Sequence, residues 1–257
     1  MFNLESFDIK LNTEFVGRNF VYSDEIDSTN SFLLNKENKF NTDGTVILAE
    51  KQNKGHGRKD RVWYSSKGQN LTFSILLTSK KIYSKKFNHI NFAASLSVAM
   101  AIENLFQLKT ELKWPNDILI NGKKIAGILL ESISKGSKID RLIIGIGINV
   151  NQAVFQGVFN IPPTSLKIEL NENIDREKLL AEFLNTFEEM LEKVKTNPEE
   201  ILKDWKSRCR LIGEKIVIEG GEKTKYGIFD DLDDDGFLLL NVGGKIEKIH
   251  FGEVSVA

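Results

Sequence analysis

Apolar runs of strand length alternate with polar loops in the first part of the chain. Three of these runs are predicted to be strands, at residues 19–26, 45–50 and 71–77. Residues 27–30, Asp-Ser-Thr-Asn, can cap a helix that begins near Phe32. A strand-to-helix turn of this kind places backbone N–H groups and hydroxyls where a small ligand can use them. The alternative is that Ser28 or Thr29 only caps the helix.

The middle of the chain predicts a central helix and a β-hairpin. Residues 87–106 are rich in small side chains that permit close packing on a sheet. An Asn-Gly pair at 121–122 joins the runs 118–120 and 123–131, and this pair suits a type I′ turn. Residues 141–150 are apolar nearly throughout, so this strand is expected to lie centrally in the sheet.

The pattern changes again toward the C-terminus. Residues 151–174 show no clear periodicity and are expected to form a loop. Asp175 is expected to cap a long amphipathic helix, and Pro198 to begin a shorter one. From residue 211 onward short strands separated by turn residues predict a small β-barrel or sandwich. We therefore expect two domains, at residues 1–210 and 211–257.

Composition excludes several classes of protein. The 257 residues are 41% hydrophobic and 28% charged, which is typical of soluble globular proteins and argues against a disordered or membrane protein. A formal net charge of −1 argues against a protein whose main task is to bind nucleic acid. The single cysteine, Cys209, excludes an intramolecular disulfide, and the N-terminus has no signal-peptide core. These observations favour a cytoplasmic protein.

Residues 51–63, Lys-Gln-Asn-Lys-Gly-His-Gly-Arg-Lys-Asp-Arg-Val-Trp, form the most distinctive loop. Two glycines flank His56 and let the backbone approach a ligand closely, while lysines and arginines supply donors suited to an anion such as phosphate. The alternative is a solvated loop between two strands. Its length and its position between apolar strands favour a binding loop.

Several other motifs are rejected. Residues 231–236, Asp-x-Asp-x-Asp-Gly, imitate the start of a calcium loop, but Val242 stands where a glutamate is required, so a hairpin turn is expected. Gly145-x-Gly147 lacks the third glycine of a dinucleotide fingerprint and lies within a predicted strand. The three histidines are far apart in the sequence and show no metal-ligand spacing.

Segments that follow one another along about residues 20–257 together resemble the biotin protein ligases. They are Asp27-Ser28-Thr29-Asn30; Gln52 with Gly55-His56-Gly57-Arg58-Lys59-Asp60-Arg61-Val62-Trp63; Lys113-Trp114-Pro115-Asn116-Asp117; Lys124-Ile125-Ala126-Gly127-Ile128-Leu129-Leu130-Glu131; and Gly147-Ile148-Asn149-Val150. The resemblance implies an α+β fold, with a mixed β-sheet packed with helices in a catalytic domain like that of class II aminoacyl-tRNA synthetases. It also implies that the C-terminal barrel is an SH3-like module.

The resemblance implies a reaction in two steps. Biotin and ATP, with Mg²⁺ on the phosphates, give biotinyl-5′-AMP and pyrophosphate, and a lysine of a biotin carboxyl carrier domain then takes the biotinyl group. The chain is thus expected to be a biotin–[biotin carboxyl carrier protein] ligase. The first step brings a carboxylate toward a polyphosphate, so cations must offset the repulsion. A lysine about 4 Å from such a charge contributes roughly 4 kcal/mol at an effective dielectric near 20.

The resemblance also implies roles for individual residues. Lys113, at a strand end beside Pro115, and Arg58 are the expected catalytic residues. Trp63 is expected to stack on adenine and Asn149 to orient the nucleotide. The expected biotin site consists of Ser28, Thr29, Asn30, Gln52, Gly55, His56, Gly57, Arg58, Lys113 and Gly127. The expected ATP or adenylate site consists of Arg58, Arg61, Trp63, Lys113, Asn116 and Asn149, without a protein-held metal.

The glycine-rich loop departs from the family pattern Gly-Arg-Gly-Arg-x-Gly. His56 replaces an arginine and Asp60 replaces a glycine. A histidine loses its charge near neutral pH, so we hypothesise that the adenylate is retained less well as pH rises, and that a His56→Arg variant removes this dependence. We also predict that residues 51–61 are mobile without ligand and order over the adenylate, which hydrolyses if water reaches it.

Rival functions remain open. A lipoate ligase or octanoyltransferase is the nearest enzymatic alternative, and a catalytically silent biotin-binding module is an alternative of another class. About 20 residues precede the first predicted strand and show no pair of helices suited to DNA, so no DNA binding is expected. No membrane contact is expected. A homodimer is possible, with residues 141–150 as an exposed sheet edge.

Overall fold

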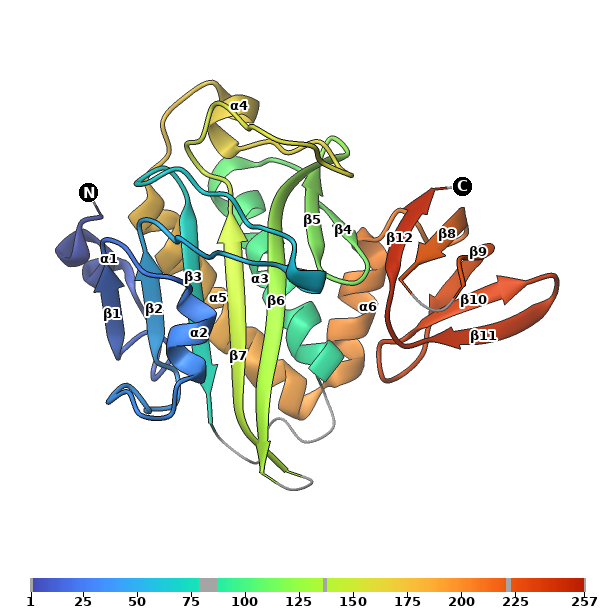
Figure 1. Cartoon of the computed structure of the whole chain (residues 1–257), viewed down its shortest axis with the longest axis horizontal. Coiled ribbons are helices and arrows are strands. Elements are labelled where there is room, and N and C mark those ends of the chain that lie inside the picture. The colour runs from blue at the N-terminus through green and yellow to red at the C-terminus, as the bar shows by residue number, and fades with distance from the viewer. Residues whose placement is uncertain (1, 79–86, 136–137, 221–222, 257) are drawn as a thin grey trace.

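The computed structural model describes residues 2–78, 87–135, 138–220 and 223–256, and these residues build two sheets (Figure 1). The larger sheet has the strand order β1-β2-β3-β7-β6-β5-β4. Its strands are β1 (Phe20–Ser23), β2 (Val46–Ala49), β3 (Leu71–Leu77), β4 (Glu111–Lys113), β5 (Asp117–Ile120), β6 (Lys123–Lys135) and β7 (Lys138–Ile148). Of the strand pairs that the described residues form in this sheet, β1–β2 is parallel and the others are antiparallel, so the sheet is mixed, as predicted.

The central position of β7 is confirmed. Residues 142–148 pair with β3 on one side and with β6 on the other, and the apolar side chains of this segment are buried. The alternative in which residues 141–150 form an exposed sheet edge is therefore wrong over 142–148. The β5–β6 hairpin is also confirmed, because Asn121 and Gly122 have φ angles of 52° and 72°, as a type I′ turn requires.

Helices cover the two faces of the larger sheet unequally. The apolar helix α3 (Phe87–Phe106) and the amphipathic helices α5 (Arg176–Thr196) and α6 (Pro198–Arg208) pack together on one face. On the other face, within the described residues, the short helix α2 (Thr29–Leu34) is the one α-helix that covers part of the sheet, over β2, β3 and β7 (Figure 1). The remainder of that face is left to loops, and the cavity described below lies there.

Two short helices were not predicted. Helix α1 (Leu4–Lys10) packs against α5 near the N-terminus. Helix α4 (Leu166–Leu170) lies within the segment predicted to be a loop, and the Ser165 side chain caps it by accepting a hydrogen bond from the Ile168 N–H. A helix of this length has too few residues to show a period in sequence.

The second sheet has the strand order β11-β10-β9-β8-β12. Its strands are β8 (Lys215–Glu219), β9 (Lys225–Leu232), β10 (Leu238–Val242), β11 (Lys245–Ile249) and β12 (Glu253–Val256), of which β12 was not predicted. The acidic segment 231–236 contains the end of β9 and the β9–β10 turn, as expected, with the Gly236 N–H donating to the Asp233 carbonyl. This turn contacts the larger sheet, because the Trp114 indole N–H donates to the Gly236 carbonyl at 3.4 Å.

Candidate functional site

A cavity of about 780 Å³ lies on the face of the larger sheet that α2 covers only in part. Its floor contains Gly127 on β6 and Gly145 and Gly147 on β7. The absence of side chains at Gly145 and Gly147 makes room for the side chains of Asn30 and Trp63. A Cβ atom at Gly145 would lie 2.4 Å from Asn30 Oδ1, and one at Gly147 would lie 2.4 Å from the Trp63 ring. The Gly-x-Gly pair rejected as a dinucleotide motif is thus the floor of this cavity.

One end of the cavity is lined by neutral polar groups at the start of α2. Ser28 caps the helix by accepting a hydrogen bond from the Ser31 N–H, so the capping interpretation is confirmed while Ser28 also lines the cavity. The Thr29 N–H and hydroxyl lie 2.7 and 3.0 Å from Gln52 Oε1. The Thr29 N–H therefore occupies Gln52 Oε1, and the Gln52 Nε2 group is left for other acceptors.

The glycine-rich loop folds back on itself beside this polar end. The Gly57 N–H donates to the Arg61 carbonyl at 2.7 Å, and the Trp63 N–H donates to the Gly55 carbonyl at 2.9 Å. Between these contacts lies a short 3₁₀ turn, η1 (Arg58–Asp60). Gly55 is buried and does not line the cavity; a Cβ atom there would lie 2.8 Å from Gln52 Nε2, so the loop approaches Gln52 closely at this residue.

His56 occupies the position where the family pattern has arginine. Its Nε2 atom lies 3.4 Å from Glu131 Oε2, and its ring also faces the cavity. The same carboxylate oxygen accepts a hydrogen bond from Asn30 Nδ2 at 2.7 Å. Glu131 therefore joins the loop to α2. The expected effect of pH on adenylate retention, and the mobility of residues 51–61, stay predictions.

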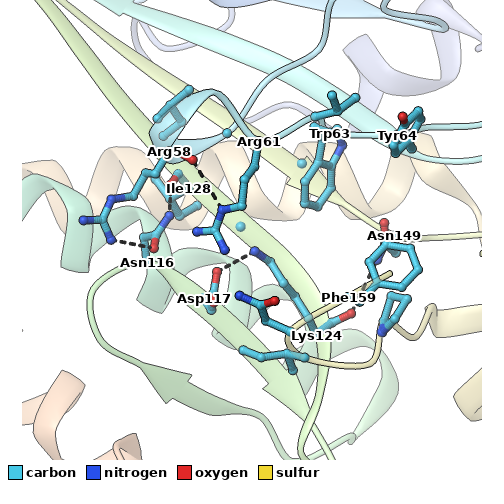
Figure 2. Close-up of a pocket in the computed structure, with 18 of the residues that line it drawn as sticks. Arg58, Arg61, Trp63, Tyr64, Asn116, Asp117, Lys124, Ile128, Asn149 and Phe159 are labelled. Carbon is cyan, nitrogen blue, oxygen red and sulfur yellow. Dashed lines mark hydrogen bonds and ion pairs between the residues drawn. The ribbon is translucent and has the colours of Figure 1, made fainter. Parts of the chain in front are cut away.

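The other end of the cavity is strongly charged. Four cations, Arg58, Arg61, Lys113 and Lys124, line the cavity there together with the carboxylates of Asp117, Glu219 and Glu253. Figure 2 shows the side chains of Arg61, Lys124 and Asp117 pointing toward one another, with Lys124 Nζ 2.6 Å from Asp117 Oδ1. The excess of positive charge suits a ligand with more than one negative charge.

Arg58 and Lys113 are both partly buried. Burial lowers the pKa of Lys113. Burial also lowers the pKa of Arg58, but Arg58 stays charged because the ordinary pKa of arginine is far above neutral pH. Arg58 donates to Asn116 Oδ1 at 3.4 Å and to the Gly252 carbonyl at 3.3 Å. No hydrogen bond or ion pair within the described residues occupies Lys113, so its ammonium is available to a ligand.

The second sheet completes the charged end. Glu253, the first residue of β12, forms an ion pair with Arg61 and lies 3.8 Å from Lys59 Nζ. With the contact between Arg58 and the Gly252 carbonyl, these interactions connect the glycine-rich loop to β12. Glu253 also lines the cavity. Sequence reasoning missed this contribution, because nothing in the sequence brings residue 253 next to residue 61.

Trp63 stands between the polar end and the charged end. Its ring lies against the Gly147 backbone, and Lys124 Nζ is 5.7 Å from the ring centroid. The Trp63 indole N–H is buried and has no hydrogen-bond partner in the described part of the chain. An acceptor supplied by a ligand, or a shift of the ring, would satisfy this N–H.

A second loop borders the charged end. Residues 155–163 line the cavity, and the side chains of Val158 and Phe159 are 101% and 41% exposed, so an apolar surface faces the opening. Asn149 fixes the far end of this loop, since its Nδ2 atom lies 3.0 Å from the Thr164 carbonyl oxygen. The Asn149 amide thus positions protein backbone, and its Oδ1 atom is the group left for a ligand (Figure 2 shows Asn149 and Phe159).

The structure brings the predicted site residues together, with Gly55 as the exception. All the others line this cavity: Ser28, Thr29, Asn30, Gln52, His56, Gly57, Arg58, Arg61, Trp63, Lys113, Asn116, Gly127 and Asn149. Lys124 and Asp117 also line it and were missed as site residues. Both belong to segments that carried the resemblance, so their place in those segments was the available signal.

The sequence is similar to proteins of known activity. Residues 22–149 match the Biotin/lipoate A/B protein ligase family, and residues 211–256 match the Biotin protein ligase C terminal domain. The Bifunctional ligase/repressor BirA of Bacillus subtilis is 35% identical over 251 residues, which are 96% of this chain and 76% of that protein. The Biotin--[acetyl-CoA-carboxylase] ligase of Mycobacterium tuberculosis is 30% identical over 88% of this chain and 85% of that protein.

The fold is similar to solved structures as well. The Biotin protein ligase from Aquifex aeolicus in complex with biotin and ATP matches with a TM-score of 0.81 and 32% sequence identity, covering 93% of this chain and 99% of that one. Among the residues that the structure describes, no helix is long and apolar enough to cross a membrane.

Proposed function

The chain belongs to the biotin protein ligase family and catalyses ATP-dependent ligation of biotin, and from this premise we propose how substrates occupy its cavity. Its fold is the α+β fold of class II aminoacyl-tRNA synthetase-like enzymes. The ureido head of biotin lies at the polar end, against Thr29 and Gln52. The carboxylate extends over the glycine floor toward the charged end, where ATP places its α-phosphate. The observation that carries this proposal is the position of the two ends in a single cavity.

In the proposed first step a biotin carboxylate oxygen attacks the α-phosphorus of ATP. A bond forms between that oxygen and phosphorus, the bond to the β-phosphate oxygen breaks, and pyrophosphate leaves. Both reactants are anions, so the step requires cations at the point where they meet. Lys113 and Arg58 were the expected catalytic residues, and we add Lys124, which the Asp117 carboxylate holds at 2.6 Å beside the glycine floor.

In the proposed second step the amine of an acceptor lysine attacks the acyl carbon, and AMP leaves. The relatives named as ligases of acetyl-CoA carboxylase support a biotin carboxyl carrier domain as the acceptor. The chain would thus be a biotin–[biotin carboxyl carrier protein] ligase acting in the cytoplasm. The division into residues 1–210 and 211–257 and a possible homodimer are part of the same proposal.

Mg²⁺ has no protein-built site in this proposal. The described residues contain no group of three histidine, cysteine or acidic side chains arranged to hold a metal ion. We propose that Mg²⁺ enters on the ATP phosphates, where it offsets phosphate charge. Asp117 is engaged with Lys124 rather than left as a free metal ligand.

Biotin-dependent exchange between ATP and pyrophosphate tests the first step, because it requires reversible formation of the adenylate. We expect exchange with biotin and none with lipoate or octanoate, since those acids offer no partner to Thr29 and Gln52. Exchange with lipoate or octanoate in place of biotin would favour the rival ligase, and binding of biotin without exchange would favour the silent module. Incubation with biotin, ATP, Mg²⁺ and purified carrier domains tests the second step.

A further inference from the structure

Asn30 lies between two acceptors and a hydroxyl at the polar end of the cavity. Its Nδ2 atom is 2.7 Å from Glu131 Oε2 and 3.5 Å from the Leu129 carbonyl oxygen, and its Oδ1 atom is 2.5 Å from Ser74 Oγ. An ionised carboxylate and a carbonyl can only accept hydrogen bonds. The Asn30 amide nitrogen must therefore face them, and its oxygen must face Ser74.

This orientation sets the direction of a chain of hydroxyl groups. Ser74 Oγ lies within hydrogen-bond distance of Asn30 Oδ1 and, at 2.7 Å, of Thr29 Oγ1. A hydroxyl has one proton. Because Asn30 Oδ1 can only accept, the Ser74 proton goes to Asn30. The Thr29 proton then has two acceptors within reach, Ser74 Oγ at 2.7 Å and Gln52 Oε1 at 3.0 Å. Gln52 Oε1 already accepts from the Thr29 N–H, and the closer Ser74 oxygen would otherwise face Thr29 with lone pairs on both sides, so Thr29 donates to Ser74. The Thr29 oxygen is then left with lone pairs only, on the wall of the cavity.

Loss of Glu131 removes the stronger of the two acceptors that orient the amide. The Asn30 amide could then turn over, so that Nδ2 donates to Ser74. Ser74 would donate to Thr29, and the Thr29 proton would be directed to Gln52 Oε1, 3.0 Å away, or into the cavity. The Thr29 hydroxyl would then present a proton where it had presented a lone pair, and a ligand N–H would meet a donor instead of an acceptor.

We propose that Glu131 is a positioning residue that makes Thr29 a hydrogen-bond acceptor and thereby selects acids whose head group carries an N–H. The proposal rests on the proposed function, in which the ureido head lies against Thr29 and Gln52. A cyclic urea has N–H donors, whereas a dithiolane ring or an alkyl chain has none. A site built to pair with a polar group of its substrate rejects analogues that lack this group, because its own buried groups are left unpaired.

The test compares binding of biotin, of biotin methylated on both ureido nitrogens, and of ATP to the parent and to a Glu131→Ala variant by titration calorimetry. We expect the Kd for biotin to rise by about tenfold to a hundredfold in the variant, which corresponds to an unpaired buried polar group. The preference for biotin over the methylated analogue should shrink by a similar factor, and the Kd for ATP should not change. A Glu131→Gln variant should recover most of the preference, because its amide oxygen still accepts from Asn30.

Two further measurements separate positioning from general weakening. Glu131→Ala and Asn30→Ala should not be additive in a double-mutant cycle, since Glu131 acts through Asn30. Glu182→Ala is the matched control, because Glu182 Oε1 accepts from Asn104 Nδ2 at 2.9 Å away from the cavity. An unchanged preference in Glu131→Ala, or additive effects in the cycle, would overturn the proposal. A parent chain that binds no biotin would instead refute the proposed function itself.

Discussion

Lys124 Nζ lies 2.6 Å from Asp117 Oδ1, across the β5–β6 hairpin that borders the charged part of the cavity. The two residues lie on adjacent strands, so the hairpin fixes their spacing. A carboxylate at this distance forms a charge-assisted hydrogen bond that limits the conformations of the lysine side chain. Lys124 also faces the Trp63 ring, so its ammonium group lies over the floor of the cavity. In the proposed function a substrate carboxylate approaches the α-phosphate at this place.

Replacement of Lys124 by alanine should abolish most of the first step. We expect biotin-dependent ATP–pyrophosphate exchange to fall by at least about a hundredfold, because a cation about 4 Å from a developing charge contributes roughly 4 kcal/mol at an effective dielectric near 20. Lys123→Ala is the matched control, since Lys123 is the next residue and its side chain is 47% exposed and paired with Glu169. Equal losses in the two variants would contradict the role of Lys124.

Lys113 should determine how activity falls at alkaline pH. Burial lowers the pKa of Lys113, so this ammonium loses its proton at a lower pH than an exposed lysine does as pH rises. We expect kcat/KM for ATP to fall on the alkaline side, and the fall to move to higher pH in Lys113→Arg, because arginine keeps its charge. The maximal rate of that variant should be lower. Lys109→Arg, at an exposed position just before β4, is the control and should keep the profile of the parent.

The elements of the fold that carry a long or repeated pattern were predictable. Helix α3 and strand β3 begin and end where their apolar runs do, and Asp175 caps α5 as expected. Helix α4 was not predictable because its single turn shows no period. Strand β12 was missed because a strand this short, ending next to the C-terminus, has no flanking turn on one side to define it.

The candidate site was predictable only where neighbouring residues in the sequence act together. Residues 27–30 and 55–63 are continuous segments, and their composition already indicated polar and anion-binding roles. Glu253 contacts Lys59 and Arg61, which are far from it in the sequence, and no local sequence pattern predicts these contacts. Asn30 was expected to contact the ligand, but its amide is already engaged by Ser74 and Glu131. Only the positions of atoms distinguish a residue that binds from one that positions its neighbour.

The buried ion pair between Arg176 and Glu50 should contribute strongly to stability. Arg176 Nη1 lies 2.6 Å from Glu50 Oε2, its Nη2 lies 3.0 Å from Oε1, and both side chains are buried. Arg176→Ala leaves the Glu50 charge buried without its partner, so we expect the free energy of unfolding in urea to fall by about 3–5 kcal/mol. Arg210→Ala is the control, because Arg210 is 71% exposed and its pair with Glu111 should contribute about 0–1 kcal/mol.

The same ion pair predicts a loss of stability in acid. Burial raises the pKa of Glu50, but the hydrogen bonds and charge of Arg176 outweigh burial and lower it below the ordinary value. A carboxyl group whose pKa is lowered in the folded state stabilises that state above its unfolded pKa, and this contribution is lost as pH falls. Unfolding measured from neutral pH down to about pH 3, below the ordinary glutamate value, should show this loss in the parent. A parent as stable in acid as at neutral pH would contradict it.

Glu253 should help the glycine-rich loop to retain the adenylate. It pairs with Arg61 and lies 3.8 Å from Lys59 Nζ, so its carboxylate connects the loop to β12. Glu253→Gln removes this attraction, and the loop should open more often and admit water to the acyl phosphate. We expect biotin-dependent formation of AMP without an acceptor to rise by up to about fivefold, as a partly exposed ion pair of about 1 kcal/mol allows.

Salt distinguishes this electrostatic effect from a loss of packing. Raising the ionic strength screens exposed charges. The parent should therefore form AMP faster without an acceptor as salt increases, and its rate should approach that of Glu253→Gln. The variant itself should respond less to salt. Glu247→Gln is the control, because Glu247 belongs to the same sheet and accepts from Lys225 at 2.8 Å without lining the cavity. A parent whose leakage is independent of salt, or a Glu247→Gln variant that leaks as fast as Glu253→Gln, would show that the Glu253 charge does not hold the loop.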